Sequence, residues 1–246
     1  MQDITNHVVV ITGASRGIGA ALARAFADQG CRLLLTARNK PDLDKTAKAL
    51  KLPKDHIAAV FADISTAAGM KKIVAAALKK YGRIDLFINN AGVGIEKKIT
   101  DLTEKEYDQV FDTNVKAVYL SFRELIPHLK KQGGGHILNI SSMAGKQGHA
   151  GIAAYAASKA ALNSLCEGVG AEVRGNNIKI TVLAPGSTDT AFRFGMTAKS
   201  KSKMPTSSAK RKLATAEVAE AAVFLARQNA NAWVSMTEMR PLITGK

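Results

Sequence analysis

The sequence predicts an α/β fold in which helices cover both faces of one parallel sheet, giving three layers and a single domain over residues 1–246. Two observations indicate this fold. Short runs rich in Val and Ile alternate with longer Ala-rich amphipathic stretches, which is the pattern of repeated strand–helix units. The first strand also leads through a glycine-rich turn into the first helix. Because crossovers between parallel strands are right-handed, we expect a doubly wound sheet of the Rossmann type.

Each element follows from its local pattern. The strands are short β-branched runs, the helices have apolar residues at helical spacing, and Gly30 is suited to end the first helix. A turn of three glycines, 133–135, precedes the fifth strand, and Pro127 lies near the end of the longest helical region. Strands are expected over residues 7–12, 32–36, 57–61, 86–89, 136–140 and 179–184. Helices are expected over residues 17–29, 41–50, 67–81, 104–129 and 153–174.

The last sixty residues interrupt this regular alternation. Thr215 is expected to cap a helix that runs to about residue 227, and residues 233–240 to form a last edge strand. Before them, a segment at about 190–213 is rich in Lys and Arg and has no acid between Phe192 and Lys212. It follows the carboxyl end of a strand, where ligands bind in such sheets. It is therefore either a flexible basic lid over the substrate or a solvated loop.

Composition excludes several classes of protein. Hydrophobic residues make up 46% of the chain and charged residues 22%, as in ordinary globular proteins. We find neither a membrane-spanning run nor a signal pattern, so a cytoplasmic location is expected. Cys31 and Cys166 are expected to be buried free thiols, and no Cys/His cluster has metal-ligand spacing.

The formal net charge of +15 has three possible explanations. It can reflect a solvated basic surface, attraction to an anionic substrate, cofactor or carrier protein, or binding to nucleic acid. Aromatic residues make up only 5% and no nucleic-acid-reading motif is present, which argues against the third explanation.

The turn between the first strand and helix is suited to a dinucleotide. Glycines let the backbone approach a pyrophosphate, and the helix N-terminus offers free N–H groups. We expect this turn to bind through Gly13, Ser15, Arg16, Gly17, Ile18 and Gly19.

The end of the second strand selects the form of the dinucleotide. An NAD site has a carboxylate there for the ribose 2′-OH, but this chain has Arg38 and no acid between Thr36 and Lys40. Arg38 can bind a 2′-phosphate, and Arg16 is a second candidate for it. The cofactor expected is therefore NADP(H), unless Arg38 is merely exposed.

Tyr155 and Lys159 are four residues apart in an Ala-rich helix, so their side chains lie on one face. A cation beside a phenol favours the phenolate and lowers the phenol pKa. The pair could therefore exchange a proton with an alcohol or ketone near neutral pH.

Together these motifs resemble the short-chain dehydrogenase/reductase family over nearly the whole chain. The resemblance includes T-G-x-x-x-G-x-G from Thr12, Asn89-Asn90-Ala91-Gly92, and Pro185-Gly186 leading to Thr190. It implies that Tyr155 is the general acid/base, that Ser142 polarises the carbonyl, and that Lys159 holds the nicotinamide ribose and depresses the Tyr155 pKa.

The resemblance also implies roles for residues that no local pattern reveals. Asn114 would order a water that links Lys159 to solvent, although it could instead simply kink its helix. Asp63 and Ile64 would hold the adenine, and Asn90 could mainly tie the central strands together. The remaining cofactor contacts it implies are Ala91, Gly92, Pro185, Gly186, Thr188 and Thr190.

The function expected is reversible reduction of a ketone to a secondary alcohol. A 3-oxoacyl thioester reductase acting on acyl carrier protein or CoA stays open, since a basic lid could receive an acidic carrier. The tail after Trp233 lacks the glycine-rich end common in such reductases and is more like that of relatives acting on small carbonyls. A non-catalytic NADP sensor is a further alternative, although such proteins typically lose the active Tyr or Lys.

We expect a homodimer or homotetramer that packs through the helices around Asn114 and Tyr155.

Overall fold

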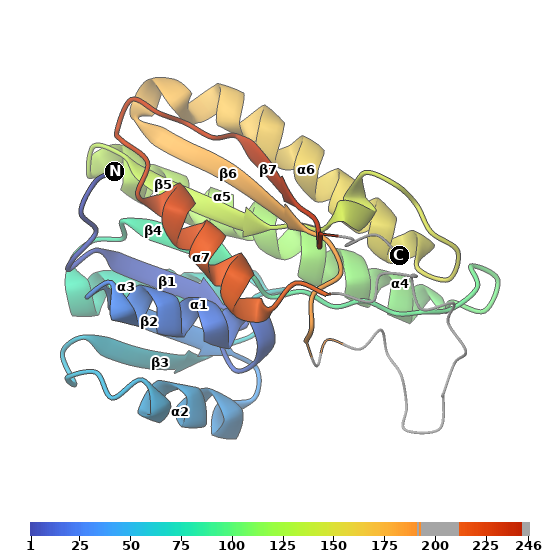
Figure 1. Cartoon of the computed structure of the whole chain (residues 1–246), viewed down its shortest axis with the longest axis horizontal. Helices are drawn as coiled ribbons and strands as arrows, with labels where there is room; N and C mark the ends of the chain where they lie inside the picture. The colour runs from blue at the N-terminus through green and yellow to red at the C-terminus, as the bar shows by residue number, and fades with distance from the viewer. Residues whose placement is uncertain (191, 193–211, 243–246) are drawn as a thin grey trace.

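The computed structural model describes residues 1–190, 192 and 212–242. Seven parallel strands form one sheet in the order β3-β2-β1-β4-β5-β6-β7, flanked by helices (Figure 1). The strands are β1 (Val8–Thr12), β2 (Arg32–Ala37), β3 (Ile57–Phe61), β4 (Leu86–Asn89), β5 (Gly135–Ile140), β6 (Ile178–Pro185) and β7 (Met236–Met239). The chain reverses its direction of travel across the sheet between β1 and β4, which confirms the doubly wound topology.

The helices alternate with these strands as the periodicity predicts. They are α1 (Gly17–Asp28), α2 (Lys40–Ala49), α3 (Ala67–Tyr81), α4 (Glu104–Phe111), α5 (Ala117–Lys131), α6 (Ala153–Val173) and α7 (Thr215–Ala226). Short 3₁₀ turns, η2 (Met143–Gly145) and η3 (Arg174–Asn176), follow β5 and α6.

The two faces of the sheet are covered by different helices. Leu33 and Leu35 of β2 pack in a core with α1, α2 and α7, whereas Leu34 packs in a second core with α3, α5 and α6. Alternate side chains of a strand point to opposite faces, so one buried strand serves both cores. Figure 1 shows α1 and α7 together on the near face of the sheet. The three-layer prediction is therefore confirmed.

Most predicted boundaries agree with the structure to within one residue, and three elements differ by more or in kind. The helical region 104–129 is divided by a π-helical turn, η1 (Asp112–Lys116), into α4 and α5. Thr215 is the first residue of α7 and not its cap; instead the Glu217 carboxylate accepts the Ala214 N–H at 2.6 Å. The last strand covers only Met236–Met239 of the predicted 233–240, and Trp233, which precedes it, donates its indole N–H to Ile180 O at 2.9 Å.

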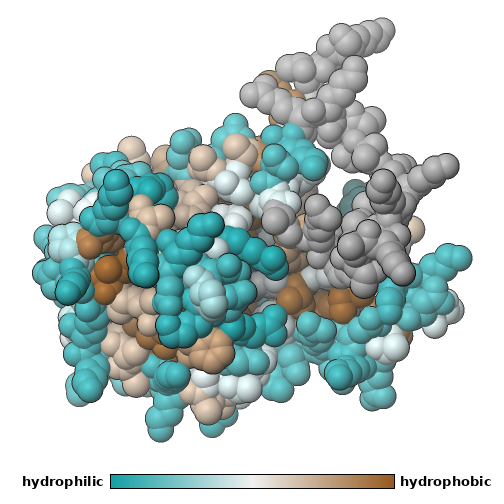
Figure 2. Space-filling model, turned by 90° about the horizontal axis from the view of Figure 1, so that it is seen from below, coloured by the Kyte–Doolittle hydropathy of each residue, from teal (hydrophilic) through white to brown (hydrophobic). Residues whose placement is uncertain are grey.

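The cysteines, the surface and the basic segment can also be compared with what the sequence predicted. Cys31 and Cys166 are buried and free, as predicted. Among the described residues, no helix is long and apolar enough to cross a membrane. On the face seen in Figure 2, hydrophilic residues cover most of the described surface and hydrophobic ones form small separate patches. The proposed basic lid at about 190–213 falls almost entirely outside the described residues.

Candidate active site

The turn after β1 lies in close contact with the loop after β4. A Cβ at Gly13, whose φ is +66°, would lie only 2.8 Å from Ala91 Cα. A Cβ at Gly19 would lie 2.2 Å from Gly13 O, far inside van der Waals contact. Glycine is therefore required at both positions by the space available, and at Gly13 also by the backbone conformation.

Hydrogen bonds hold this turn against the loop. Thr12 Oγ1 accepts the N–H groups of Asn90 and Ala91 at 3.0 and 3.1 Å. Asn90 Nδ2 donates to Thr12 O at 2.8 Å. The Asn90 side chain thus joins the ends of β1 and β4, the alternative to a cofactor contact that the sequence left open.

The N-terminus of α1 fits an anionic group. Arg16 is the N-cap residue, no side chain accepts the free N–H groups of the first turn, and that turn contains no acid. Unsatisfied N–H groups and the helix dipole favour an anion at this point. Thr190 lies beside the turn, since its Cβ is 3.8 Å from a Cβ built at Gly17.

Arg38 and Asp63 follow β2 and β3 at the same edge of the sheet. Asp63 Oδ1 accepts the N–H of Ser65 at 3.0 Å and its hydroxyl at 2.7 Å. Partial burial raises the pKa of Asp63, but these hydrogen bonds and the charge of Arg38 outweigh it and lower the pKa overall. Ile64 beside it is buried in the core. Asp63 is therefore ionised at neutral pH.

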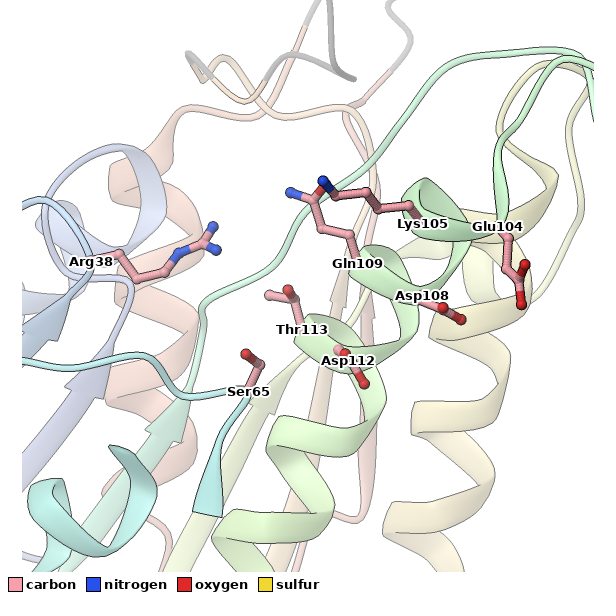
Figure 3. Close-up of a pocket in the computed structure, with 8 residues that line it drawn as sticks. All are labelled: Arg38, Ser65, Glu104, Lys105, Asp108, Gln109, Asp112 and Thr113. Carbon is pink, nitrogen blue, oxygen red and sulfur yellow. The ribbon is translucent and has the colours of Figure 1, made fainter. Parts of the chain in front are cut away.

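A cavity of about 480 Å³ lies between Arg38 and helix α4 (Figure 3). Ser65 lines it on the sheet side, and Gln109 and Thr113 on the helix side. Arg38 and Ser65 place this cavity beyond the carboxyl ends of β2 and β3, where nucleotides bind in such sheets.

Ser142 and Tyr155 meet beyond the ends of β5 and β6. Ser142 Oγ accepts the Ala144 N–H at 3.1 Å, and the Ser142 side chain hydrogen-bonds Tyr155. Ser141 is turned elsewhere and donates to Asn163 Oδ1 at 2.6 Å. Ser142, and not Ser141, is thus the serine beside the Tyr155 hydroxyl.

Lys159 lies one helical turn from Tyr155 and is 4% exposed. Its Nζ is 5.9 Å from the centroid of the Tyr155 ring and donates to Ile140 O at 2.9 Å. Gly92 comes close to the same group, because a Cβ built there would be 3.7 Å from Lys159 Nζ. The loop after β4 therefore reaches Lys159 as well as the glycine turn.

Burial controls the protonation of both groups. It raises the pKa of Tyr155, and the hydrogen bond with Ser142 only partly offsets it. It also lowers the pKa of Lys159 to about 8. The sequence predicted that Lys159 would lower the pKa of Tyr155. The surrounding protein gives the opposite direction, because desolvation of the phenolate is the largest effect.

Asn114 lies in the π-helical turn η1 and is 1% exposed. Its Oδ1 accepts the Val93 N–H at 2.9 Å, and its Nδ2 donates to Val93 O and to Ser158 Oγ at 2.8 and 3.0 Å. A π-bulge widens a helix locally and often marks a functional site. Here it coincides with an amide that joins the loop after β4 to α6.

Pro185 is the last residue of β6, and Gly186 and Thr188 follow it. Gly186 packs against the backbone of Met239 and Arg240, and Thr188 Oγ1 donates to Gly186 O at 3.0 Å. These residues therefore lie at the carboxyl end of β6, where it pairs with β7.

Sequence reasoning missed two sets of contacts. Ser158 donates to Tyr155 O at 2.7 Å and joins it to Asn114, yet no spacing rule identifies it. Lys146 pairs with Glu238 of β7, which also binds Arg240 at 3.1 Å. Long-range ion pairs of this kind have no sequence signal.

The fold and this arrangement define a Rossmann-type α/β protein with its candidate site at the carboxyl edge of the sheet. A family profile described as short chain dehydrogenase matches residues 7–201, so the chain belongs to that family of oxidoreductases.

Relatives cover the whole chain. An uncharacterized oxidoreductase of Staphylococcus haemolyticus is 32% identical over 246 residues, spanning 98% of this chain and 100% of the relative. A metagenomic short-chain oxidoreductase solved in complex with NADP is 31% identical with a TM-score of 0.83, over 99% of this chain and 100% of that one. A 3-ketoacyl-(acyl-carrier-protein) reductase from Brucella melitensis, complexed with NADH, is 30% identical with a TM-score of 0.86, over 96% and 98%.

The close contact at the turn predicts the effect of adding one methyl group. Gly19→Ala should lower the free energy of unfolding by about 1 to 3 kcal/mol, because the new Cβ would overlap Gly13 O and push the turn from Asn90. Gly168→Ala in α6 is the matched control. It meets nothing within 4 Å and should raise stability by up to about 1 kcal/mol. Urea unfolding measures both, and equal effects would refute the steric argument.

Proposed function

We propose that the chain is an NADP(H)-dependent oxidoreductase that interconverts a ketone and a secondary alcohol. The observation that carries the proposal is the convergence of Ser142, Tyr155 and Lys159 beside the glycine turn at one edge of the sheet. When bound, NADPH supplies the hydride that reduces the carbonyl carbon.

The protein's part is to hold and protonate the carbonyl oxygen. Ser142 and Tyr155 offer two hydroxyl groups side by side. Both can donate a hydrogen bond to that oxygen as negative charge develops on it. Tyr155 keeps its proton at neutral pH because burial raises its pKa. It is thus in the form needed to donate during reduction, and the phenolate that it leaves is the base for the reverse reaction.

Lys159 and Asn114 support the Tyr155 hydroxyl in this role. Lys159 is fixed by Ile140 O behind the phenol, and Asn114 fixes Ser158 in the same helical turn. In this proposal Lys159 also binds the ribose that carries the nicotinamide. Asn114 and Lys159 conduct a proton from solvent to replace the one that Tyr155 donates.

Three features support NADP over NAD. Arg38 faces the cavity beside α4, the end of β2 has no acid, and Arg16 caps the helix that faces the pyrophosphate position. A guanidinium binds a phosphate through paired charge-assisted hydrogen bonds.

A second substrate class is favoured by separate observations. Similarity to a 3-ketoacyl-(acyl-carrier-protein) reductase and the net charge of +15 agree with an acidic, carrier-linked thioester. A panel of small ketones, an acyl-CoA and an acyl-carrier thioester separates the two. Absence of turnover of both thioesters would remove this alternative.

The role of Tyr155 is tested by removing one oxygen atom. Tyr155→Phe should lower turnover of NADPH with any accepted ketone by about 10² to 10⁴-fold, since the general acid is lost. NADPH affinity should stay within about threefold, because the ring and Lys159 remain. Tyr119→Phe, at an exposed tyrosine of α5, is the control and should leave both values unchanged. Equal loss of turnover and affinity in Tyr155→Phe would contradict the assignment.

The choice of cofactor is tested at the end of β2. Arg38→Asp should reverse the ratio of NADPH to NADH affinity, because a carboxylate repels the 2′-phosphate and accepts the ribose 2′-OH. Arg123→Asp, an exposed charge reversal on α5, controls for the change in net charge. An unchanged ratio in Arg38→Asp would show that Arg38 does not select the cofactor.

The assembly proposed is a homodimer or homotetramer packed through α4, α5 and α6. Tyr107 and Tyr119 of these helices are 42% and 47% exposed, and Tyr107 stacks on Phe111 at 4.5 Å. Exposed aromatic side chains are enriched in protein interfaces. Sedimentation should give a dimer or tetramer that Tyr119→Glu weakens, whereas a wild-type monomer at micromolar concentration would exclude this assembly.

A further inference from the structure

One side of helix α6 faces the chain that leaves β5. Tyr155, Lys159 and Asn163 are spaced four residues apart, so they lie along this side of the helix. Tyr155 is hydrogen-bonded by the Ser142 side chain, and Lys159 Nζ donates to Ile140 O at 2.9 Å. The first two residues of this row therefore belong to the candidate active site, and Asn163 continues the row one turn further along α6.

Asn163 binds the residue next to Ser142. Ser141 Oγ donates to Asn163 Oδ1 at 2.6 Å, a short hydrogen bond between two side chains. Ser141 is 4% exposed, and its backbone N–H donates to Leu183 O of β6 at 2.8 Å. A buried hydroxyl is costly to leave without a partner. Ser141 is therefore fixed on two sides, by the sheet through its backbone and by α6 through its side chain.

The other end of the turn that carries Ser142 also lies on α6. A Cβ built at Gly145, the last residue of η2, would be 2.8 Å from the carbonyl carbon of Lys159 and 3.0 Å from Asn163 Nδ2. This space cannot hold a side chain, so the turn packs directly on the helix. Asn163 thus lies beside both ends of segment 141–145, since it accepts a hydrogen bond from the first residue and its amide nitrogen lies against the last.

The place of Ser142 relative to Tyr155 depends on how this segment sits on α6. The Ala144 and Gly145 N–H groups donate to Ser142, but these bonds only maintain the shape of the turn. Two hydroxyls can stabilise charge on one carbonyl oxygen only when both are correctly placed, and a displacement of about 1 Å can cost about 10²-fold in rate. A contact that joins the segment to the helix therefore bears on the rate of the reaction.

We infer that Asn163, through Ser141, is a positioning residue that sets the place of the Ser142 hydroxyl relative to Tyr155. This inference rests on the proposed function, in which Ser142 and Tyr155 act together on the substrate oxygen. Ser141 and Asn163 do not contact that oxygen in this account and act only through Ser142.

A double-mutant cycle measured in single turnovers of NADPH with an accepted ketone tests the inference. Ser141→Ala and Asn163→Ala each remove one partner of the hydrogen bond, and each should lower the rate by about 5- to 30-fold because Ser142 is then less well placed. Both changes together should cost no more than the larger of the two. In a Ser142→Ala background, Asn163→Ala should lower the rate by less than about twofold, since the hydroxyl that it positions is absent.

Ser164→Ala is the matched control, at an exposed serine next to Asn163 on α6, and should leave the rate unchanged. NADPH affinity within about twofold of the wild type shows that a variant is folded. Ser141→Ala alone can complete the cycle if Asn163→Ala does not fold, because it leaves no buried donor without a partner.

The cycle separates this inference from the proposed function. Equal rate losses from Asn163→Ala, or from Ser141→Ala, with and without the Ser142 hydroxyl would overturn the inference, as would no loss in either variant. The proposed role of Ser142 would stand in those cases as long as Ser142→Ala itself slows the reaction. A Ser142→Ala protein with the wild-type rate would overturn both.

Discussion

The contact between the turn after β1 and the loop after β4 determines where the other parts of the site can lie. At Gly13 and Gly19 there is no room for a side chain, and Thr12 and Asn90 hold the two segments together by hydrogen bonds. The same loop continues to Gly92 and Val93, which touch Lys159 and Asn114. One backbone segment thus connects the glycine turn to Tyr155, Lys159 and Asn114 at the other end of the candidate site.

The end of the candidate site that holds Tyr155 and Lys159 is built from polar groups taken out of water, which has a cost. An isolated charge in a low-dielectric interior is unfavourable, so a buried ammonium loses its proton more easily. The pKa of Lys159, lowered to about 8, reflects this cost, and its hydrogen bond to Ile140 O offsets part of it. Tyr155 responds in the opposite sense, because for a phenol the neutral form is the protonated one. Burial therefore favours the neutral, protonated form of Tyr155.

The fold was accessible from the sequence, and much of the site's composition was accessible through the resemblance. Parallel strands and right-handed crossovers allow few topologies, so alternation alone predicted the sheet. The resemblance also named Ser142, which lies beside Tyr155, whereas Ser141 is directed to Asn163.

What could not be predicted depends on contacts between distant segments. The π-helical turn at Asn114 has no periodic signature, and the direction of the Tyr155 pKa requires knowing how deeply the phenol is buried. The pairing of Lys146 with Glu238, and the hydrogen bond between Ser141 and Asn163, arise only when β7 and α6 are placed in three dimensions.

The central claim is that Tyr155 transfers its proton to the substrate oxygen during reduction. The most direct measurement is the single-turnover rate of NADPH oxidation with an accepted ketone in mixtures of H₂O and D₂O. The account predicts a slower rate in D₂O that falls linearly with deuterium content, as expected for one proton in flight. A rate unaffected by D₂O, under conditions where deuterium at the transferred hydride position does slow the reaction, would contradict it.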